Sequence, residues 1–363
     1  MRPTGCCSSS RSPENPRRPR PPQPIARAKA VLIRRQTLSI GLIGCGRVAV
    51  NVHIPSIRKI RGARIVAFAE PSEERRVAGS ALIPGAIALE NPSDLLDIAE
   101  VEAVVVCLPN ELHAQTAVEA IERGRHVYLE KPIALSLEEA ERVIAARERA
   151  GVIGMMGFNQ RFNRLYRELR EQIALRKHGD WQAARTVLTA PEIDLPDWKR
   201  VRRCGGGALL DQASHHFDLA RYLFDDEIAE VSAELHSHRS EDDTAVVNLR
   251  LTRGLLVQSF FSIHSANEDR IEVYAERGRI SVDRYRPRGL NLLYRLERRR
   301  APARDPSFGE ALSQFVAAVR AGSLVTPSFE DGFHSLAAVL AADASARSGR
   351  KVAPSPMKRE TLG

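Results

Sequence analysis

The sequence predicts an α/β fold in which a doubly wound parallel sheet comes first and an α+β domain with a large, mostly antiparallel open sheet follows. Two observations predict this division. Over residues 38–158 short apolar runs alternate with helix-length segments, which is the rhythm of parallel βαβ units. After residue 159 several alternating strands follow one another through short connections, which favours antiparallel pairing. A chain of 363 residues is long enough for two ordinary domains.

The parallel sheet is expected to begin at Leu38, and each of its strands is an apolar or β-branched run. The runs are 38–44, 63–70, 102–109, 126–130 and 151–158. Helices are expected between them, at 71–80, 111–124 and 136–151, after a first helix-length segment that extends to about Arg61. Proline and acids favour a helix start near residue 71, and Gly124 stops the second helix. Ser136 and Glu139 predict a capping box at the start of the third.

The second domain is predicted over 159–353, with a C-terminal tail at 354–363. A charged helix at 161–178, a strand at 182–189 and a strongly amphipathic helix at 205–224 open it. Apolar and polar residues then alternate in five runs, as in half-buried strands. The runs are 227–237, 244–252, 255–263, 269–276 and 278–284. Two helices, at about 307–320 and 331–347, close the domain.

The net charge of +9 is concentrated at the N-terminus. Residues 1–37 hold nine Arg and Lys residues and one acid, so the rest of the chain carries only +1. A charge this small does not indicate a nucleic-acid surface. Residues 1–37 are predicted to be a disordered basic tail. A transit peptide and a start codon assigned too far upstream are alternatives, although seven prolines disfavour the amphipathic helix of a transit signal.

The five cysteines lack the spacing of a metal site, and no metal is predicted. Cys45 and Cys107 lie in or beside apolar runs, where a small buried thiol is expected. The longest apolar stretches are too short or too charged for a membrane span, and the start of the chain lacks the apolar core of a secretory signal. These features favour a cytoplasmic protein.

The first apolar run ends in GCGRVA at 44–49, a G-x-G-x-x-A pattern at a strand-to-helix turn. Gly44 permits the tight turn, and Gly46 lets the backbone approach a pyrophosphate that faces the helix N-terminus. The pattern alone also occurs in ordinary glycine-rich turns. Glu70, at the end of the next strand, strengthens it because a carboxylate there accepts the ribose hydroxyls. A dinucleotide-binding Rossmann domain is therefore predicted over 38–158. Its expected cofactor contacts here are Gly44, Gly46, Arg47, Val48 and Glu70.

Glu70 also bears on the choice of cofactor, because a carboxylate at this position repels the 2′-phosphate of NADP. Arg75 and Arg76 are close enough in the sequence to bind such a phosphate, although solvated helix residues are the simpler interpretation. NAD is favoured, and NADP stays open.

Glu130, Lys131 and Pro132 end the run at 126–130. The carboxyl ends of the strands form the ligand crevice of a doubly wound sheet, so Lys131 is expected to point into it. Its ammonium could hydrogen-bond the reacting oxygen and stabilise a developing alkoxide. A strand-end lysine in water is the alternative. Pro132 could carry a cis bond that aims the lysine, which the sequence alone does not show.

The amphipathic helix carries DQASHHFD at 211–218. In an α-helix Asp211, His215 and Asp218 share one face. A carboxylate one turn from an imidazole can hydrogen-bond to it, and histidine titrates where an alcohol-to-ketone conversion needs a proton acceptor. His216 points elsewhere and could be structural. For an isolated Asp/His pair, helix-surface electrostatics is the competing interpretation.

Five segments, taken in order, make the chain resemble the glucose–fructose oxidoreductase / inositol dehydrogenase / rhizopine-catabolism (Gfo/Idh/MocA) family over about residues 38–353. They are GLIGCGRVA, CLPNELH, YLEKPIA, GFNQRFN and GGGALLDQASHHFDLARYLF. The resemblance implies a catalytic triad of Lys131, Asp211 and His215.

The resemblance also implies further contacts. Those expected near the cofactor are Leu108, Pro109, Asn110, His113, Glu130 and Lys131. Leu108 is commonly a Thr in the family, so a hydroxyl contact is missing there. Asn159 and Arg161 match the family's positions near the substrate, and Trp198 and His216 are further candidates for substrate contact. The segment Trp198-Lys199-Arg200 could line the pocket, and core packing of Trp198 fits as well.

The resemblance and the site together imply one reaction. His215 takes a proton from a substrate hydroxyl while hydride leaves the same carbon for the nicotinamide, Lys131 holds the oxygen, and Asp211 orients His215 or a second hydroxyl. The expected function is an NAD(P)-dependent interconversion of a hydroxyl and a ketone on a sugar, cyclitol or related polyol.

Three alternatives stay open: an NAD-dependent glycosidase on the same fold, a non-catalytic dinucleotide-binding regulatory protein, and nucleic-acid binding by the basic tail. The resemblance also implies a homodimer or homotetramer formed through the outer face of the second sheet. Apolar residues that suit such an interface, or a monomer's core, are Val246, Leu249, Leu251, Phe260 and Ile263.

Overall fold

The first sheet is parallel, with strand order β3-β2-β1-β4-β5-β6, in a computed structural model that describes residues 37–191, 196–285 and 306–358. Its strands are β1 (Leu38–Ile43), β2 (Ala63–Ala69), β3 (Ile87–Leu89), β4 (Ala103–Val106), β5 (His126–Leu129) and β6 (Gly154–Met156). The order reverses between β1 and β4, which is the switch point where doubly wound sheets bind dinucleotides. The predicted parallel sheet is confirmed.

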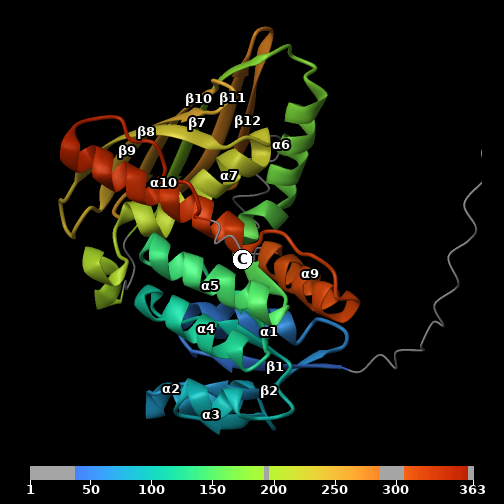
Figure 1. Ribbon diagram of the computed structural model, residues 1–363. Coiled ribbons are helices and arrows are strands. Elements are labelled where there is room, and N and C mark those ends of the chain that lie inside the picture. The colour runs from blue at the N-terminus through green and yellow to red at the C-terminus, as the bar shows by residue number, and fades with distance from the viewer. Residues whose placement is uncertain (1–36, 192–195, 286–305, 359–363) are drawn as a thin grey trace, which may run out of the picture. The chain divides into compact units, whose positions relative to one another are not determined.

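Helices cover both faces of this sheet (Figure 1). They are α1 (Ile54–Ile57), α2 (Glu73–Leu82), α3 (Pro92–Leu96), α4 (His113–Glu122), α5 (Leu137–Ala150) and α9 (Ser307–Ala321). Ile40 and Leu42 pack in one apolar cluster with α1 and α9, whereas Ile43 packs in another with α4 and α5. The strands are therefore buried on both sides, as their nearly continuous apolar sequences predict.

Three details of this region differ from the sequence prediction. The short elements β3 and α3 carry too few apolar residues to show a period, and they were not expected. The expected capping box forms only in half: the Ser136 hydroxyl accepts the Glu139 amide, but the Glu139 carboxylate accepts the amide of Leu135. Within the run at 151–158 only β6 forms a strand, and Gly151 instead ends α5 in the left-handed conformation.

The second sheet has the order β12-β11-β7-β10-β9-β8, and only the β7–β10 pair is parallel. Its strands are β7 (Trp181–Thr189), β8 (Ile228–His236), β9 (Thr244–Leu251), β10 (Leu256–Ser262), β11 (Glu268–Ala275) and β12 (Gly278–Asp283). The prediction of a mostly antiparallel sheet is confirmed, and with it the predicted fold class.

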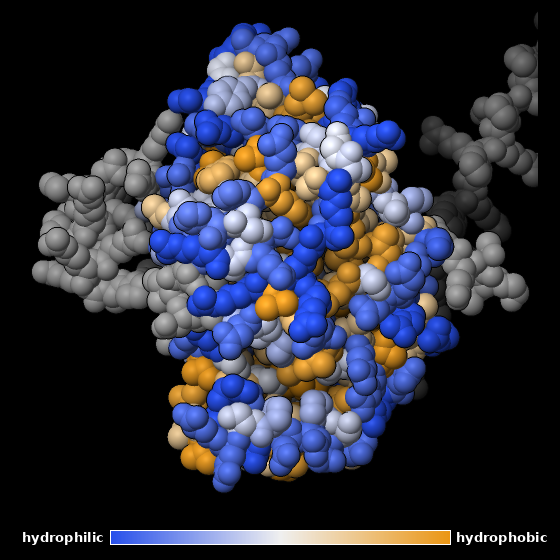
Figure 2. All heavy atoms as spheres, turned by 90° about the vertical axis from the view of Figure 1, so that its left-hand side faces the viewer, coloured by the Kyte–Doolittle hydropathy of each residue, from blue (hydrophilic) through white to orange (hydrophobic). Residues whose placement is uncertain are grey.

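Helices α6 (Arg164–Leu175), α7 (Ser214–Phe224) and α10 (Phe329–Ser348) share one apolar cluster with the second sheet. Leu249 and Leu251 are buried in this cluster, whereas Val246 and Leu256 are exposed. On the face drawn in Figure 2, hydrophobic and hydrophilic side chains are interspersed. The predicted homo-oligomer stays a prediction.

Helix α10 contacts the cores of both sheets. Phe329 and Phe333 near its start pack with residues of the parallel sheet, and Ala338 and Val339 pack with the second. The Thr37–Gly363 part of the chain accordingly forms one compact unit. The predicted domain boundaries stay predictions, and residues 1–36 of the predicted tail lie outside the described residues. Over the described ranges, no helix is long and apolar enough to cross a bilayer.

Candidate active site

The turn after β1 has the geometry that the glycine pattern predicts. Gly44 has φ +92°, and a Cβ there would lie 2.5 Å from the Cys107 carbonyl oxygen, so glycine is required. A Cβ on Gly46 would meet nothing within 4 Å, which leaves open space above the loop. Arg47 and Val48 are exposed beside it. The π-helical turn η1 (Ala49–His53) follows directly. The loop therefore fits a pyrophosphate at its backbone amides.

Glu70 is buried behind this loop, and both of its carboxylate oxygens have partners. Oε2 accepts the Cys45 amide at 2.9 Å, and Oε1 accepts the Ser72 amide at 3.0 Å and Arg75 Nη2 at 2.7 Å. Burial alone would raise the pKa of Glu70, but these hydrogen bonds outweigh it and lower the pKa. Arg75 is thus more than a solvated helix residue, and a ribose hydroxyl would share Glu70 with it.

The segment from the end of β4 to the start of α4 contains four of the predicted cofactor contacts, and two of them have backbone partners. Asn110 is buried and donates to the Gly205 carbonyl at 2.9 Å. His113 is buried, with Nδ1 2.6 Å from the Pro132 carbonyl oxygen and Nε2 3.0 Å from that of Leu108. Both side chains therefore hold backbone segments together, whereas Leu108 and Pro109 are half-buried at the crevice.

Lys131, Lys199 and Asp211 form what we call the lysine cluster. Lys131 Nζ lies 2.7 Å from the Asp211 carbonyl oxygen and 3.1 Å from its Oδ1. Lys199 Nζ lies 2.7 Å from the same Oδ1. Burial would raise the pKa of Asp211, but the charges of both lysines outweigh it and lower the pKa strongly. The Lys131–Pro132 bond is cis. Two predicted triad members are thus joined, together with a lysine to which the sequence assigned no definite role.

Asp211 lies in a second π-helical turn, η6 (Leu209–Ala213), directly before α7. A π turn adds a residue, so the α-helical spacing assumed for Asp211 and His215 does not hold there. In the described part of the chain no hydrogen bond joins these two side chains. Asp211 still acts on His215 electrostatically, because its charge opposes the lowering of the His215 pKa.

His215 is half-buried, and its ring meets Phe158 edge-on at 6.4 Å between centroids. Burial first, and then the charge of Lys131, hold the pKa of His215 well below its usual range. Its Nδ1 is buried without a hydrogen-bond partner, which leaves Nε2 as the nitrogen able to meet a ligand. A neutral imidazole with one accessible nitrogen is suited to accept a proton.

Glu130, next to Lys131, pairs with a histidine that the sequence analysis missed. His53, at the end of η1, is fully buried, and its Nε2 lies 2.8 Å from Glu130 Oε1. Both π turns therefore place a polar side chain on the Glu130–Lys131 segment. A histidine within the apolar sequence VNVHIPS was the only signal for this contact.

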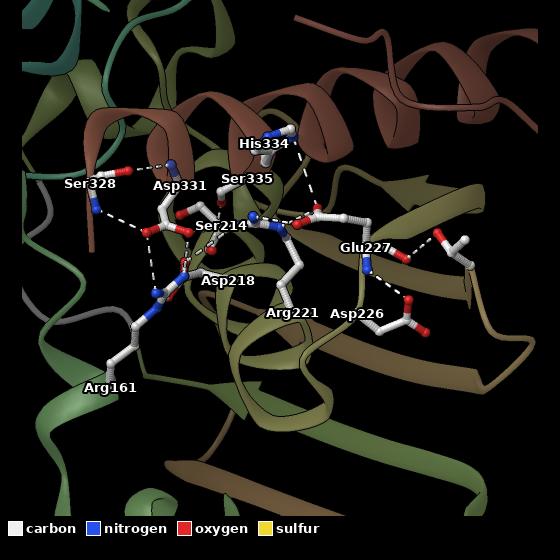
Figure 3. A network of polar contacts seen from close by, with 11 residues as sticks. Arg161, Ser214, Asp218, Arg221, Asp226, Glu227, Ser328, Asp331, His334 and Ser335 are labelled. Atoms are coloured by element: carbon white, nitrogen blue, oxygen red, sulfur yellow. Dashed lines mark hydrogen bonds and ion pairs between the residues drawn. The ribbon is translucent and has the colours of Figure 1, made fainter. Parts of the chain in front are cut away.

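Arg161 and Asp218 belong to a separate group, the arginine network, which also contains Arg221, Glu227 and Asp331 (Figure 3). Arg161 makes a two-pronged contact with Asp218 at 2.6 and 2.8 Å and also contacts Asp331 at 2.9 Å. Arg221 binds Glu227 at 2.6 and 2.7 Å. Asp211 and Asp218 therefore have different partners: Asp211 binds the two lysines, and Asp218 binds Arg161.

The network borders a pocket of about 490 Å³ that contains none of the predicted triad in its lining. Asn159 and His216 also have structural partners: Asn159 donates to Ser307 Oγ at 2.9 Å, and His216 Nε2 lies 3.3 Å from Asp269 Oδ1 in a buried group. Trp198, by contrast, stays beside the lysine cluster, with its ring 5.4 Å from Lys199 Nζ.

Comparisons with known proteins agree with this architecture. Residues 38–158 match the model of the oxidoreductase family with an NAD-binding Rossmann fold, and residues 166–281 match the GFO/IDH/MocA C-terminal domain. The myo-inositol 2-dehydrogenase of Thermotoga maritima is 31% identical over 87% of this chain and 98% of its own. The 1,5-anhydro-D-fructose reductase of Ensifer adhaerens is 30% identical over 85% and 96%. A crystal structure from Thermotoga maritima, described as a "probable dehydrogenase", has a TM-score of 0.76 and 30% identity over 87% and 98%.

The chain therefore belongs to the Gfo/Idh/MocA oxidoreductase family. The predicted family, the predicted NAD-binding Rossmann domain and the prediction of an oxidoreductase are confirmed.

Proposed function

We propose that the protein is an NAD-dependent dehydrogenase that interconverts a hydroxyl and a ketone on a sugar, cyclitol or related polyol. The observation that carries the proposal is the grouping of Lys131, Asp211 and His215 at the carboxyl end of β5, the edge where the nucleotide loop also lies. The names of the two relatives, an inositol dehydrogenase and an anhydrofructose reductase, support this substrate class.

Each side chain has a role that its contacts support. Lys131 uses two of its three N–H donors on Asp211, so the third can donate to the substrate oxygen and stabilise negative charge there. His215, neutral because its pKa is lowered, accepts the hydroxyl proton at Nε2. Asp211 holds Lys131 in position. NAD, when bound, supplies the hydride acceptor.

Glu70 supports NAD over NADP, because its ionised carboxylate lies beside the predicted ribose site. Arg75 weakens this preference, since its guanidinium already contacts Glu70 and is 58% exposed. Assaying both cofactors with the same substrate measures the outcome directly. A clear preference for NADP would overturn this part of the proposal.

The central experiment combines a panel of cyclitols and sugars with the substitution His215→Ala. Loss of the proton acceptor should lower kcat by about 10²- to 10⁴-fold while NAD binding stays within about twofold, because the proposed role of the imidazole is to take a proton from the substrate and not to hold the nucleotide. The matched control is His236→Ala, an exposed histidine of β8 that should change neither. Unchanged turnover in the His215 variant would contradict the proposal, and release of free sugar without net NADH would instead indicate a glycosidase.

A further inference from the structure

We propose that the ammonium of Lys199 binds an anionic group of the substrate, a carboxylate or a phosphate, so that the preferred substrate is an acidic polyol. This inference rests on the proposed function and specifies its substrate class. Lys199 binds the same carboxylate as Lys131, but it lies after the parallel sheet in the sequence. Lys199 also makes one hydrogen bond to Asp211, whereas Lys131 makes two.

The hydrogen-bond donors of Lys199 are mostly unused. An ammonium has three N–H donors, and Lys199 directs one to Asp211 Oδ1 at 2.7 Å. Among the residues that the structure describes, no other carboxylate is ion-paired with it, and the side chain is 23% exposed. Two donors therefore make no hydrogen bond within the described residues, and the Trp198 ring lies 5.4 Å from the ammonium, beside the space that a ligand would occupy. A carboxylate or phosphate offers oxygens to both, whereas a single hydroxyl accepts less well.

The charges of the cluster favour the same class of ligand. Lys131 and Lys199 share one carboxylate oxygen, so one of the two ammoniums has no counter-charge of its own. Glu130 does not supply it within the described structure, because its partner is His53. The oxidised nicotinamide ring would add a further positive charge. A neutral polyol leaves this excess in a half-buried site, whereas an anionic group offsets it.

Lys199 is also held in place, unlike an ordinary surface lysine. It lies in the 3₁₀ turn η4 (Asp197–Arg200), and its carbonyl accepts the Gly207 amide at 3.2 Å. A Cβ on Gly206 would overlap the Lys199 backbone, so the glycines after the turn let it pack closely. Asn110 fixes the same glycine segment through the Gly205 carbonyl. The ammonium is thus positioned by a loop that is tied to the parallel sheet.

The test compares matched substrates that differ only at one carbon: galactose, galacturonate and galactose 6-phosphate, each with NAD. The full-length enzyme is expected to give a higher kcat/KM with an acid than with galactose. Lys199→Met should lower the ratio of acid to neutral kcat/KM by about 10- to 100-fold, and Lys199→Arg should restore much of it. The control is Lys177→Met, an exposed lysine that should leave the ratio unchanged. The two acids show whether a carboxylate or a phosphate is preferred.

Binding of the same three compounds to the enzyme–NADH complex, measured by calorimetry, tests Lys199 even where no compound is oxidised. Equal binding of acids and galactose, or an equal loss with all three in the Lys199→Met variant, would overturn the inference. If the enzyme nevertheless oxidised neutral polyols, the proposed dehydrogenase activity would stand and only the inference about Lys199 would fail. Tighter acid binding that depends on Lys199, without oxidation of any polyol in the wider panel, would count against the proposed function alone.

Discussion

The lysine cluster and the arginine network place two aspartates of the same helical segment between cations, yet they leave very different chemistry available. Asp218 is 1% exposed and is bound by the guanidinium of Arg161, which also donates to both carboxylate oxygens of Asp331. Asp211 is 20% exposed and binds two ammoniums that each keep unused donors. In the arginine network Arg161 and Arg221 each hold one carboxylate through two hydrogen bonds, whereas in the lysine cluster each ammonium makes one hydrogen bond to the carboxylate of Asp211.

The difference follows from the two kinds of cation. A guanidinium presents a rigid fork that matches one carboxylate in two hydrogen bonds, and such a pair is suited to a buried structural contact. An ammonium is a compact charge on a flexible stem, and it can turn its donors from a carboxylate to a substrate. Sequence motifs that place Asp211 and Asp218 on one helix therefore do not by themselves assign both to one function.

The largest effect should come from breaking the arginine network. Arg161→Met leaves Asp218 buried without its main partner and should lower the free energy of unfolding by about 3–5 kcal/mol. Burial already raises the pKa of Asp218 against the opposing charge of Arg161, so the unpaired carboxylate would be costly to ionise. Denaturant unfolding measures the change.

The control for Arg161 is Arg164→Met, because Arg164 is 87% exposed and pairs with Glu168 on the surface of α6. It should change stability by less than about 0.5 kcal/mol. If the Arg161→Met variant lost turnover but not stability, Arg161 would have a role in the reaction and not in the stability of the fold.

The second-largest effect should fall on turnover and leave stability nearly unchanged. Lys131→Met removes the donor to the reacting oxygen and should lower kcat by about 10²- to 10³-fold. Stability should change by only about 1 kcal/mol or less, since Asp211 keeps Lys199 as its partner. Steady-state kinetics and denaturant unfolding on the same preparation separate the two quantities. A stability loss as large as that of Arg161→Met would show that both groups are structural.

Much of the fold could be predicted because its signals are local. Each central strand of the parallel sheet is an apolar run long enough to recognise, and the glycine turn has one backbone solution at Gly44. The elements β3 and α3 are too short to show a period. The parallel pairing of β7 with β10 depends on strands far apart in the sequence, which no local pattern specifies.

The candidate site could also be predicted only in part. Motifs found Lys131, Asp211 and His215, but they assumed α-helical spacing where the chain forms a π turn. Arg161 was placed near the substrate because it matches the family's positions, and a position in the sequence does not show which side chain will be its partner. Its partner Asp218 lies 57 residues further along the chain, and Asp269, the partner of His216, lies 53 residues beyond that histidine. Only packing decides such contacts.

The smallest effect is a shift in pH dependence, and it links the two groups most directly. Oxidation needs neutral His215, so its rate should fall only when the pH drops through the His215 pKa, which lies below the ordinary histidine range. The acid limb of kcat/KM should therefore lie below about pH 6.5 in the wild-type enzyme. Lys131→Met removes a positive charge that disfavours the imidazolium, so the pKa should rise and the acid limb should move to higher pH. Arg161→Met, if it folds, should leave the limb in place, because the Arg161 charge is neutralised by its own carboxylates. The prediction would be contradicted if the acid limb moved in the Arg161→Met variant but not in the Lys131→Met variant. The pKa of His215 would then depend on the charge of the arginine network and not on that of the lysine cluster.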